Sequence, residues 1–393
     1  MKKLVCLLLF CMVILAGCIS VPVPNIEQTV QNADPNSVVG LTNDATGSYF
    51  RAALPIVTSD TRGLIQGRIN NRADIAQVEM SLLRLASEFF DDESLYLREG
   101  QFLPADFIVN VLRMHNPDLP LSLPNVPESP IGLNPPLGST IDFGSSSFTS
   151  DSTTPIRPLV YILEQNFTSI NESSEFELEG VALALALNPY YWEVDRSIGL
   201  EVRHRMSDED IISIGQDISA SLLPLVRNLE GMDEIPILIG LFILRDNSEI
   251  LPGHFATMTY VDNERLAIGT WQPVHERHFS LPDSTGLLQN YDFSLIHEFD
   301  FFSTNVINHF PHRHSLIAQV HVVNESVFRI SMTFTMNFGG AAEKLAFHQL
   351  LELEVMQFSP HYDINIIIQD LNNVHGIITR EPYSQVFVHR VGW

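Results

Sequence analysis

GVALALALNPYYW, residues 180–192, and IPILIGLFIL, residues 235–244, are two nearly unbroken apolar stretches of this chain. Such runs are typical of strands that are buried on both faces of a sheet. Between them, residues 197–206 alternate apolar and polar side chains, as a half-exposed strand does, and residues 207–229 have the spacing of an amphipathic helix. Ser207 is the expected N-cap of that helix, with acidic residues in its first turn. We therefore expect the order strand, strand, helix, strand.

The same order of elements returns toward the C-terminus. Strands are expected at 315–323, 327–338 and 362–371, and a helix at about 341–357 stands between the second and the third. The residues of the two segments do not align, so the repeat rests on the order of the elements alone. A helix at about 287–310 would join the two ββαβ-like units. The sequence therefore predicts an α+β fold with a mixed sheet, packed helices and two such units.

A small helical segment is expected before these units. Within residues 47–114, apolar residues recur at helical spacing after Asp74, which is the expected N-cap, and a second helix should carry Pro104 in its first turn. The expected domains are a signal peptide at 1–17, a flexible tether at 18–46, the helical segment at 47–114, a Pro/Ser-rich loop at 115–156 and an α+β domain at 157–393.

The first residues, MKKLVCLLLFCMVILAGCIS, have the pattern of an export signal. Two lysines precede an apolar run at 4–16, which is shorter than the roughly 20 residues that a membrane-spanning helix needs. The run ends in Leu-Ala-Gly-Cys at 15–18, the lipobox pattern of bacterial lipoproteins. We expect a diacylglyceryl transferase to alkylate Cys18 and signal peptidase II to cut between Gly17 and Cys18.

Two acyl chains on Cys18 would hold the mature chain on the extracytoplasmic face of the cell membrane, because each buried CH₂ contributes about 0.8 kcal/mol. Cys6 and Cys11 leave with the signal peptide, so the three cysteines of the chain reduce to one that carries lipid. Neither disulfides nor a catalytic thiol are therefore expected.

The chain is strongly acidic. Its net charge is −25, and Lys344 is the only lysine after the signal peptide. Nucleic acids and anionic lipid headgroups are therefore unfavourable partners. Because arginine keeps its charge at high pH, an acidic surface with Arg in place of Lys would suit an alkaline or salty exterior. A codon bias toward arginine is the alternative explanation.

Histidines form the candidate metal site of the sequence. His309, His312 and His314 stand close together, with His275 and His278 upstream. If residues 312–314 are extended, His312 and His314 share one face, as a metal site on a strand requires. No carboxylate stands nearby at ligand spacing, so solvated histidines are the alternative. We expect no cofactor.

The sequence contains none of the common hydrolase motifs. It has no Gly-x-Ser-x-Gly turn, no His-Glu-x-x-His helix and no Ser-x-x-Lys. We therefore expect no enzymatic activity.

Positive charge is concentrated at residues 62–72. The polar residues of this stretch are Arg62, Arg68, Asn70, Asn71 and Arg72. Guanidinium groups in so acidic a protein could hold a carboxylate or phosphate ligand. Ion pairs with the acidic remainder of the chain are the structural alternative.

Several long stretches of the chain resemble one protein family. They include SYFRAALP at 48–55, TRGLIQGRINNRADI at 61–75, LYLREGQFL at 95–103, YILEQNF at 161–167, LEGVALALALNPYYW at 178–192 and ILPGHFATMTYV at 250–261. With the lipobox, they make the chain similar to the CamS family of sex-pheromone precursor lipoproteins of Gram-positive bacteria, over most of the mature chain. The resemblance implies a membrane-anchored ectodomain whose ligand is unknown.

The resemblance also implies a second product. In that family the seven residues before the lipobox cysteine are trimmed from the signal peptide and act outside the cell as a hydrophobic pheromone. Here they are Cys11, Met12, Val13, Ile14, Leu15, Ala16 and Gly17. The segment 14–16 agrees with the family pattern, whereas Cys11 replaces the usual first alanine and Gly17 closes the peptide.

The sequence thus leaves three functions open. The ectodomain is expected to be a non-enzymatic binding module. One alternative is an extracytoplasmic metal-binding protein or enzyme that uses His309, His312 and His314. The other is an envelope assembly protein that docks through the Pro/Ser-rich loop.

Overall fold

The computed structural model describes residues 39–40, 50–91, 93–115, 132–136, 140–142, 147–149, 156–173, 175–195, 199–263, 265–311 and 314–391. The signal peptide and Cys18 lie outside these residues, as do nearly all of the predicted tether and most of the predicted Pro/Ser-rich loop. The predictions for those segments are therefore not addressed by the fold.

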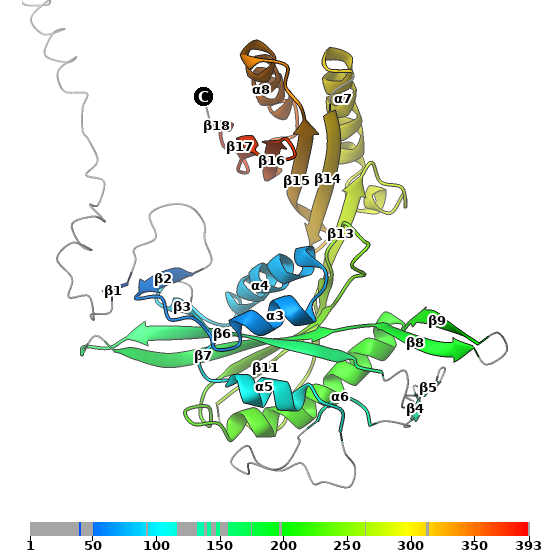
Figure 1. The fold of residues 1–393 in the computed structure, drawn as a ribbon. Coiled ribbons are helices and arrows are strands. Elements are labelled where there is room, and N and C mark those ends of the chain that lie inside the picture. The colour runs from blue at the N-terminus through cyan, green and yellow to red at the C-terminus, as the bar shows by residue number, and fades with distance from the viewer. Residues whose placement is uncertain are drawn as a thin grey trace, which may run out of the picture.

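The described residues form two mixed sheets, which confirms the predicted α+β class (Figure 1). The first sheet has the order β1 (Val39–Gly40), β2 (Arg51–Leu54), β3 (Tyr96–Glu99), β6 (Leu159–Ile170), β7 (Phe176–Leu187), β10 (Ile237–Ile243), β11 (His254–Val261), β12 (Gln272–Pro273). The second has the order β13 (Glu276–Leu281), β14 (His314–Val323), β15 (Ser326–Met336), β16 (Ile364–Gln369), β17 (Val374–Arg380), β18 (Phe387–Arg390). Two hairpins stand apart, β4 (Thr140–Asp142) with β5 (Ser147–Thr149) and β8 (Tyr190–Asp195) with β9 (Leu200–Arg205).

The helices are α3 (Arg62–Arg68), α4 (Arg72–Ala86), α5 (Ala105–Val111), α6 (Asp208–Arg227), α7 (Phe293–His309) and α8 (Ala341–Val355), with a 3₁₀ turn at Leu288–Asn290. The predicted N-cap Ser207 is confirmed, because its hydroxyl accepts a hydrogen bond from the Asp210 N–H. The predicted N-cap Asp74 is wrong. The side chain of Asn71 caps α4, and Asp74 lies in the first turn with its side chain buried.

Two units of the predicted ββαβ type are present, but the first is built from other strands than predicted, and the repeat is longer than expected. Without the β4–β5 and β8–β9 hairpins, the order β3-α5-β6-β7-α6-β10-β11-β12 matches β13-α7-β14-β15-α8-β16-β17-β18. In both sheets, successive pairs of these strands run antiparallel, antiparallel, parallel, antiparallel and antiparallel. The equivalence lies in topology and not in residue identity, which is why it left only a weak trace in the sequence.

The strand predicted over residues 180–192 is wrong in one respect. The chain leaves the sheet after Leu187, and β8 then pairs with β9 instead of extending the buried strand. Pro189 has no N–H to donate to a ladder, and the Asn188 side chain bonds both the N–H and the carbonyl of Tyr190. The apolar run therefore bends out of the sheet at these two residues. The first two strands of the first ββαβ unit are β6 and β7.

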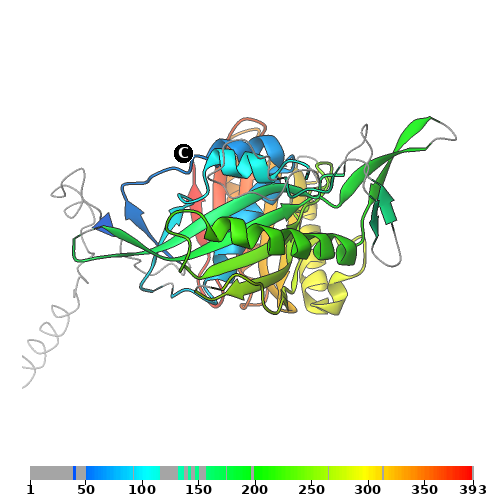
Figure 2. The ribbon, with the colours of Figure 1, turned by 90° about the horizontal axis from the view of Figure 1, so that it is seen from below.

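Each sheet has its own hydrophobic core. Helices α3 and α4 lie on one face of the first sheet and α5 and α6 on the other (Figures 1 and 2). Helices α7 and α8 cover one face of the second sheet, which stands above α4 in Figure 1. The separate cores agree with two repeated folding units. The units meet where β11 contacts β13 and where α4 contacts β13.

Candidate functional site

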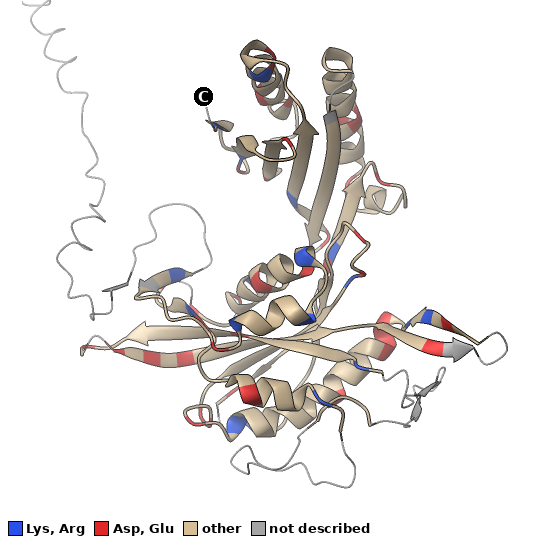
Figure 3. Cartoon of the chain, viewed as in Figure 1, with Lys and Arg blue, Asp and Glu red and all other residues tan. Residues whose placement is uncertain are grey.

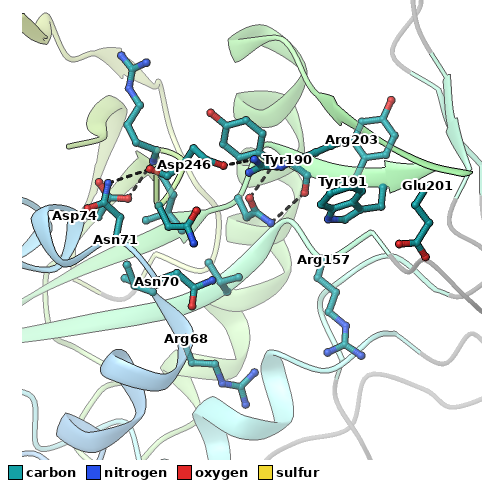
Figure 4. A pocket seen from close by; sticks show the side chains of 17 residues that line it. Arg68, Asn70, Asn71, Asp74, Arg157, Tyr190, Tyr191, Glu201, Arg203 and Asp246 are labelled. Carbon is teal, nitrogen blue, oxygen red and sulfur yellow. Dashed lines mark hydrogen bonds and ion pairs between the residues drawn. The ribbon is translucent and has the colours of Figure 1, made fainter. Parts of the chain in front are cut away.

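A cavity of about 620 Å³ opens where α3 and α4, the β8–β9 hairpin and the loop after β10 meet (Figure 4). Its polar and aromatic lining consists of Arg68, Asn70, Asn71, Asp74, Arg157, Asn188, Tyr190, Tyr191, Trp192, Glu201, Arg203, Arg245, Asp246 and Asn247. We call it the arginine pocket, because four of these residues are arginines. Its walls come from elements far apart in the chain.

Two buried polar residues attach α4 to the loop after β10. The Asp74 carboxylate accepts the backbone N–H groups of Gly253, at 2.6 Å, and Arg245, at 3.0 Å. The Asn71 amide donates to the carbonyl of Asp246 at 3.2 Å while its oxygen caps the helix. Burial raises the pKa of Asp74 to about 6, although the two backbone hydrogen bonds lower it. These contacts hold one wall of the arginine pocket in place.

The opposite wall is aromatic and carries a fixed positive charge. The guanidinium of Arg203 on β9 lies over the ring of Tyr190 on β8, 4.1 Å from its centroid, and forms an ion pair with Asp246. Hydrogen bonds from Ser248, together with the charge of Arg203, hold the pKa of Asp246 below its usual value. Trp192 is about half exposed, at 49 %. The β8–β9 hairpin therefore presents ring faces to a ligand.

Two arginines that line the pocket form no side-chain hydrogen bond or ion pair of their own with the described part of the chain. Arg68 at the end of α3 and Arg157 before β6 lie below Tyr190 and Arg203 in Figure 4. Within the described ranges, neither guanidinium has a hydrogen bond or an ion pair. Acidic residues predominate over the rest of the ribbon (Figure 3). The positive charge of these two side chains is therefore available to a ligand.

The structure brings together three of the five residues that the sequence predicted at this site. Arg68, Asn70 and Asn71 line the arginine pocket. Arg62 points elsewhere, 3.4 Å from the carboxylate of Glu99, and Arg72 is exposed outside the pocket. Arg62 and Arg68 stand at opposite ends of α3, six residues and therefore not a whole number of turns apart, and Arg72 begins α4, so the three side chains do not face one site.

The sequence analysis missed the residues that complete the pocket. Arg157, Tyr190, Trp192, Arg203 and Asp246 are separated from α3 along the chain by up to four strands of the first sheet. The only local signal was the aromatic cluster after the buried strand, which was assigned to the strand itself. Their convergence depends on how the hairpin folds back over the sheet.

The predicted histidine cluster is only partly visible. His309 is exposed at the end of α7, and its Nδ1 lies 2.8 Å from the carbonyl oxygen of Asn305 in the same helix. His312 and the side chain of His314 lie outside the described residues. His278, placed upstream of that cluster by the sequence, lies instead beside His321 on the neighbouring strand, with ring centroids 4.3 Å apart.

Over the described part of the chain, every helix is too short or too polar to cross a bilayer.

Among curated proteins, none matches this chain. Of the solved structures, the sex pheromone precursor from Lactobacillus salivarius subsp. salivarius UCC118 matches with a TM-score of 0.75 and 20% identity, covering 91% of this chain and 99% of that chain. The C-terminal domain of the sex pheromone staph-cAM373 precursor from Staphylococcus aureus matches with a TM-score of 0.65 and 20% identity, covering 83% of this chain and 99% of that chain.

These two structures share the fold of the present chain. The family model described as CamS sex pheromone cAM373 precursor matches residues 56–385, which include every residue of the arginine pocket and both repeated units except the last strand, β18. The match therefore extends over far more than half of the sequence. On this ground the chain belongs to the CamS sex pheromone cAM373 precursor family.

Proposed function

We propose that the chain is a lipid-anchored extracytoplasmic lipoprotein whose ectodomain binds a small anionic ligand in the arginine pocket. Its anchor is the acylated Cys18, and residues 11–17 of the discarded signal are the source of a hydrophobic heptapeptide. The lipobox and membership of the CamS family support the anchor and the peptide. The geometry of the arginine pocket supports the binding role.

The observation that carries the binding proposal is the pair Arg68 and Arg157. Both guanidinium groups lie at a cavity and lack a partner within the described residues. Carboxylates are abundant in a protein of net charge −25, yet neither guanidinium is neutralised by one of the described residues, so both remain open to an anion from outside. A planar guanidinium matches a carboxylate or phosphate with two parallel hydrogen bonds. The ligand therefore carries one of these anionic groups.

The aromatic wall indicates the remainder of the ligand. Tyr190 and Trp192 line the same pocket as the two arginines, and a flat, weakly polar face such as that of a sugar ring packs against aromatic rings. The cavity of about 620 Å³ has the size of a site for one small molecule. The acidic surface around it disfavours long polyanions. We infer an acidic sugar or a sugar phosphate as the ligand class.

The chemistry of the lining supports binding without catalysis. Among the described lining residues there is no serine, threonine, cysteine, histidine or lysine, and the carboxylate of Asp246 is paired with Arg203. Asp74 is buried and bonded to two backbone N–H groups. Its carboxylate serves to position the loop after β10.

Fluorescence titration tests the binding proposal. The full chain in detergent is titrated with glucuronate, glucose 6-phosphate and neutral glucose, and the emission of Trp192 is followed. We expect the two anions to change the emission and glucose to have little effect. Arg68→Gln and Arg157→Gln should each weaken binding about tenfold, as loss of a charge-assisted hydrogen bond does. Arg72→Gln is the matched control, because Arg72 is exposed and lies outside the pocket.

Equal affinities of the three arginine variants would exclude the arginine pocket as the anion site. A Trp192→Phe variant checks that the fluorescence change arises in the pocket and not at Trp271 or Trp393.

Cell fractionation and mass spectrometry test the anchor and the peptide. Wild-type protein should sediment with membranes and begin with an acylated Cys18, whereas Cys18→Ala protein from which the signal has been removed should appear in the soluble fraction. The culture medium should contain the peptide of residues 11–17. A Cys18→Ala chain that still sediments without its signal would contradict lipid anchoring.

A further inference from the structure

A second group of polar residues lies away from the arginine pocket, at the junction of the two units. Glu276 and His278 are two residues apart on β13, so their side chains leave the same face of the strand. His321 on β14 is the direct cross-strand partner of His278. The strand register therefore brings two imidazoles and one carboxylate together.

We propose that Glu276, His278 and His321 bind a divalent transition-metal ion of the zinc class. One ligand atom from each of the three lies within 4.8 Å of the other two. Two imidazoles and a carboxylate suit Zn²⁺, whereas Ca²⁺ and Mg²⁺ prefer sites made of oxygen atoms. The proposal is independent of the function proposed for the arginine pocket.

The unsatisfied nitrogen of His278 is the independent sign of a ligand. The side chain is 9% exposed, and its Nε2 is buried with no hydrogen-bond partner among the described residues. A buried nitrogen of this kind costs free energy unless something binds it. Burial lowers the pKa of His278 to about 3, so the ring is neutral at physiological pH and offers a lone pair.

His321 and Glu276 are already joined by a hydrogen bond, and a metal ion can take the place of its hydrogen. Nε2 of His321 lies 2.7 Å from Oε1 of Glu276. Zn²⁺ bonds to nitrogen and oxygen at about 2.0–2.2 Å, so in a tetrahedral site the two atoms stand about 3.3 Å apart and need to separate by about 0.6 Å. The rings of His278 and His321 are stacked with an angle of 19° between their planes.

Residues of α4 and β11, in the first unit, donate the hydrogen bonds that hold the carboxylate of Glu276. The hydroxyl of Ser81 and the amide of Gln77 donate to Oε1 of Glu276 at 2.6 and 3.0 Å, and the Phe255 N–H donates to Oε2 at 3.0 Å. Such contacts orient a metal-binding carboxylate. The guanidinium of Arg84 is 3.6 Å from Oε1 and opposes a cation, so we expect an affinity below that of a site without an arginine.

The group lies at the edge of a large cleft. This cleft, of about 1080 Å³, separates α4 from the face of the second sheet that α7 and α8 leave uncovered, and both histidines line it. A metal ion bound by three protein ligands keeps a fourth position for water or another ligand from the cleft. Because the ligands belong to the second unit and their outer contacts to the first, a bound ion also ties the two units together.

Calorimetry with zinc alone tests the proposal. The full chain in detergent is treated with a chelator, dialysed and titrated with ZnCl₂, and we expect one equivalent to bind. His278→Ala and His321→Ala should each weaken binding at least tenfold. His361→Ala is the matched control, since His361 is an exposed histidine of the same cleft outside the three-residue group. Its affinity should equal that of the wild type.

Cobalt spectroscopy keeps the test decisive if an alanine variant fails to fold. Co²⁺ bound to the wild-type chain in a four-coordinate site gives intense visible bands, and one equivalent of Zn²⁺ should remove them. Two results would overturn the proposal: no equivalent of Zn²⁺ bound by the wild type, or binding that remains unchanged in folded His278→Ala and His321→Ala proteins.

Discussion

The carboxylate of Asp74 accepts a hydrogen bond of 2.6 Å from the backbone N–H of Gly253, which lies 179 residues further along the chain. With the second bond from the Arg245 N–H, this contact attaches the first turn of α4 to the loop between β10 and β11. Asp74 is completely buried. The wall of the arginine pocket therefore depends on a charged group that water does not reach.

Stability should depend on pH through Asp74. Burial raises its pKa from 3.8 to about 6 in the folded state, so between these values the folded chain holds a proton that the unfolded chain has lost. The wild type should therefore gain stability as the pH falls from about 7 to about 4. Relative to Asp74→Asn, the gain should reach about 3 kcal/mol, because each unit of pKa corresponds to about 1.4 kcal/mol.

Urea unfolding of both proteins at several pH values measures this difference, and comparing the two chains cancels the other titrating groups. Asp60→Asn, at an exposed carboxylate, is the control and should show no such trend. A difference between wild type and Asp74→Asn that stays constant from pH 7 to pH 4 would contradict the assignment.

Gly253 should tolerate no side chain. A Cβ atom there would lie 2.0 Å from the carbonyl oxygen of Ile243, which is backbone and cannot rotate away. We expect Gly253→Ala to destabilise the fold by about 2–3 kcal/mol through overpacking. Gly63→Ala is the opposite case, because a Cβ on that residue of α3 meets nothing within 4 Å and alanine favours helices, so stability should rise by up to about 1 kcal/mol. Thermal unfolding of the two variants should show shifts of opposite sign.

Ser81 should contribute to the contact between the two units. Its hydroxyl donates to the buried carboxylate of Glu276 at 2.6 Å, and a lost hydrogen bond to a charged group costs about 1.5–3 kcal/mol. Ser81→Ala should lower the free energy of unfolding by that amount in urea. Ser221→Ala on α6 is matched, because its hydroxyl bonds only to a carbonyl of its own helix near the surface. If both variants lose the same stability, the contact with Glu276 contributes little.

Arg227 should not be replaceable by lysine. Its guanidinium donates to the carbonyls of Met232, Ile235, Asp262 and Arg265 and so closes the loops at the end of α6. Because a lysine has a single nitrogen, it leaves some of these carbonyls unsatisfied, and we expect Arg227→Lys to cost about 2–4 kcal/mol. Arg113→Lys, at an exposed position, should change stability by less than about 0.5 kcal/mol. Denaturant midpoints of the two variants distinguish these outcomes.

Local patterns were sufficient wherever neighbouring residues decide the structure. The cap at Ser207 and the helices α6, α7 and α8 follow from apolar spacing and polar ends that a short window contains. The order of elements in the second unit was predicted for the same reason. The spacing of apolar residues alone could not show where a buried strand leaves its sheet. The end of β7 before Asn188 and Pro189 was therefore not predicted. Nor could it distinguish Asn71 from Asp74 as the cap of α4.

The sequence by itself determined the class of the elements whose pattern lies within a short window, such as α6, α7, α8 and β10, because those patterns depend on residues that are close together in the chain. The lipobox pattern depends on neighbouring residues in the same way, and the lipid anchor stays a prediction. Only the tertiary structure decided which arginines share a pocket and that Glu276 and His278 meet His321, 45 residues beyond Glu276. Those contacts arise from strand register and from packing between the two units, and neither quantity is encoded in any one window of residues.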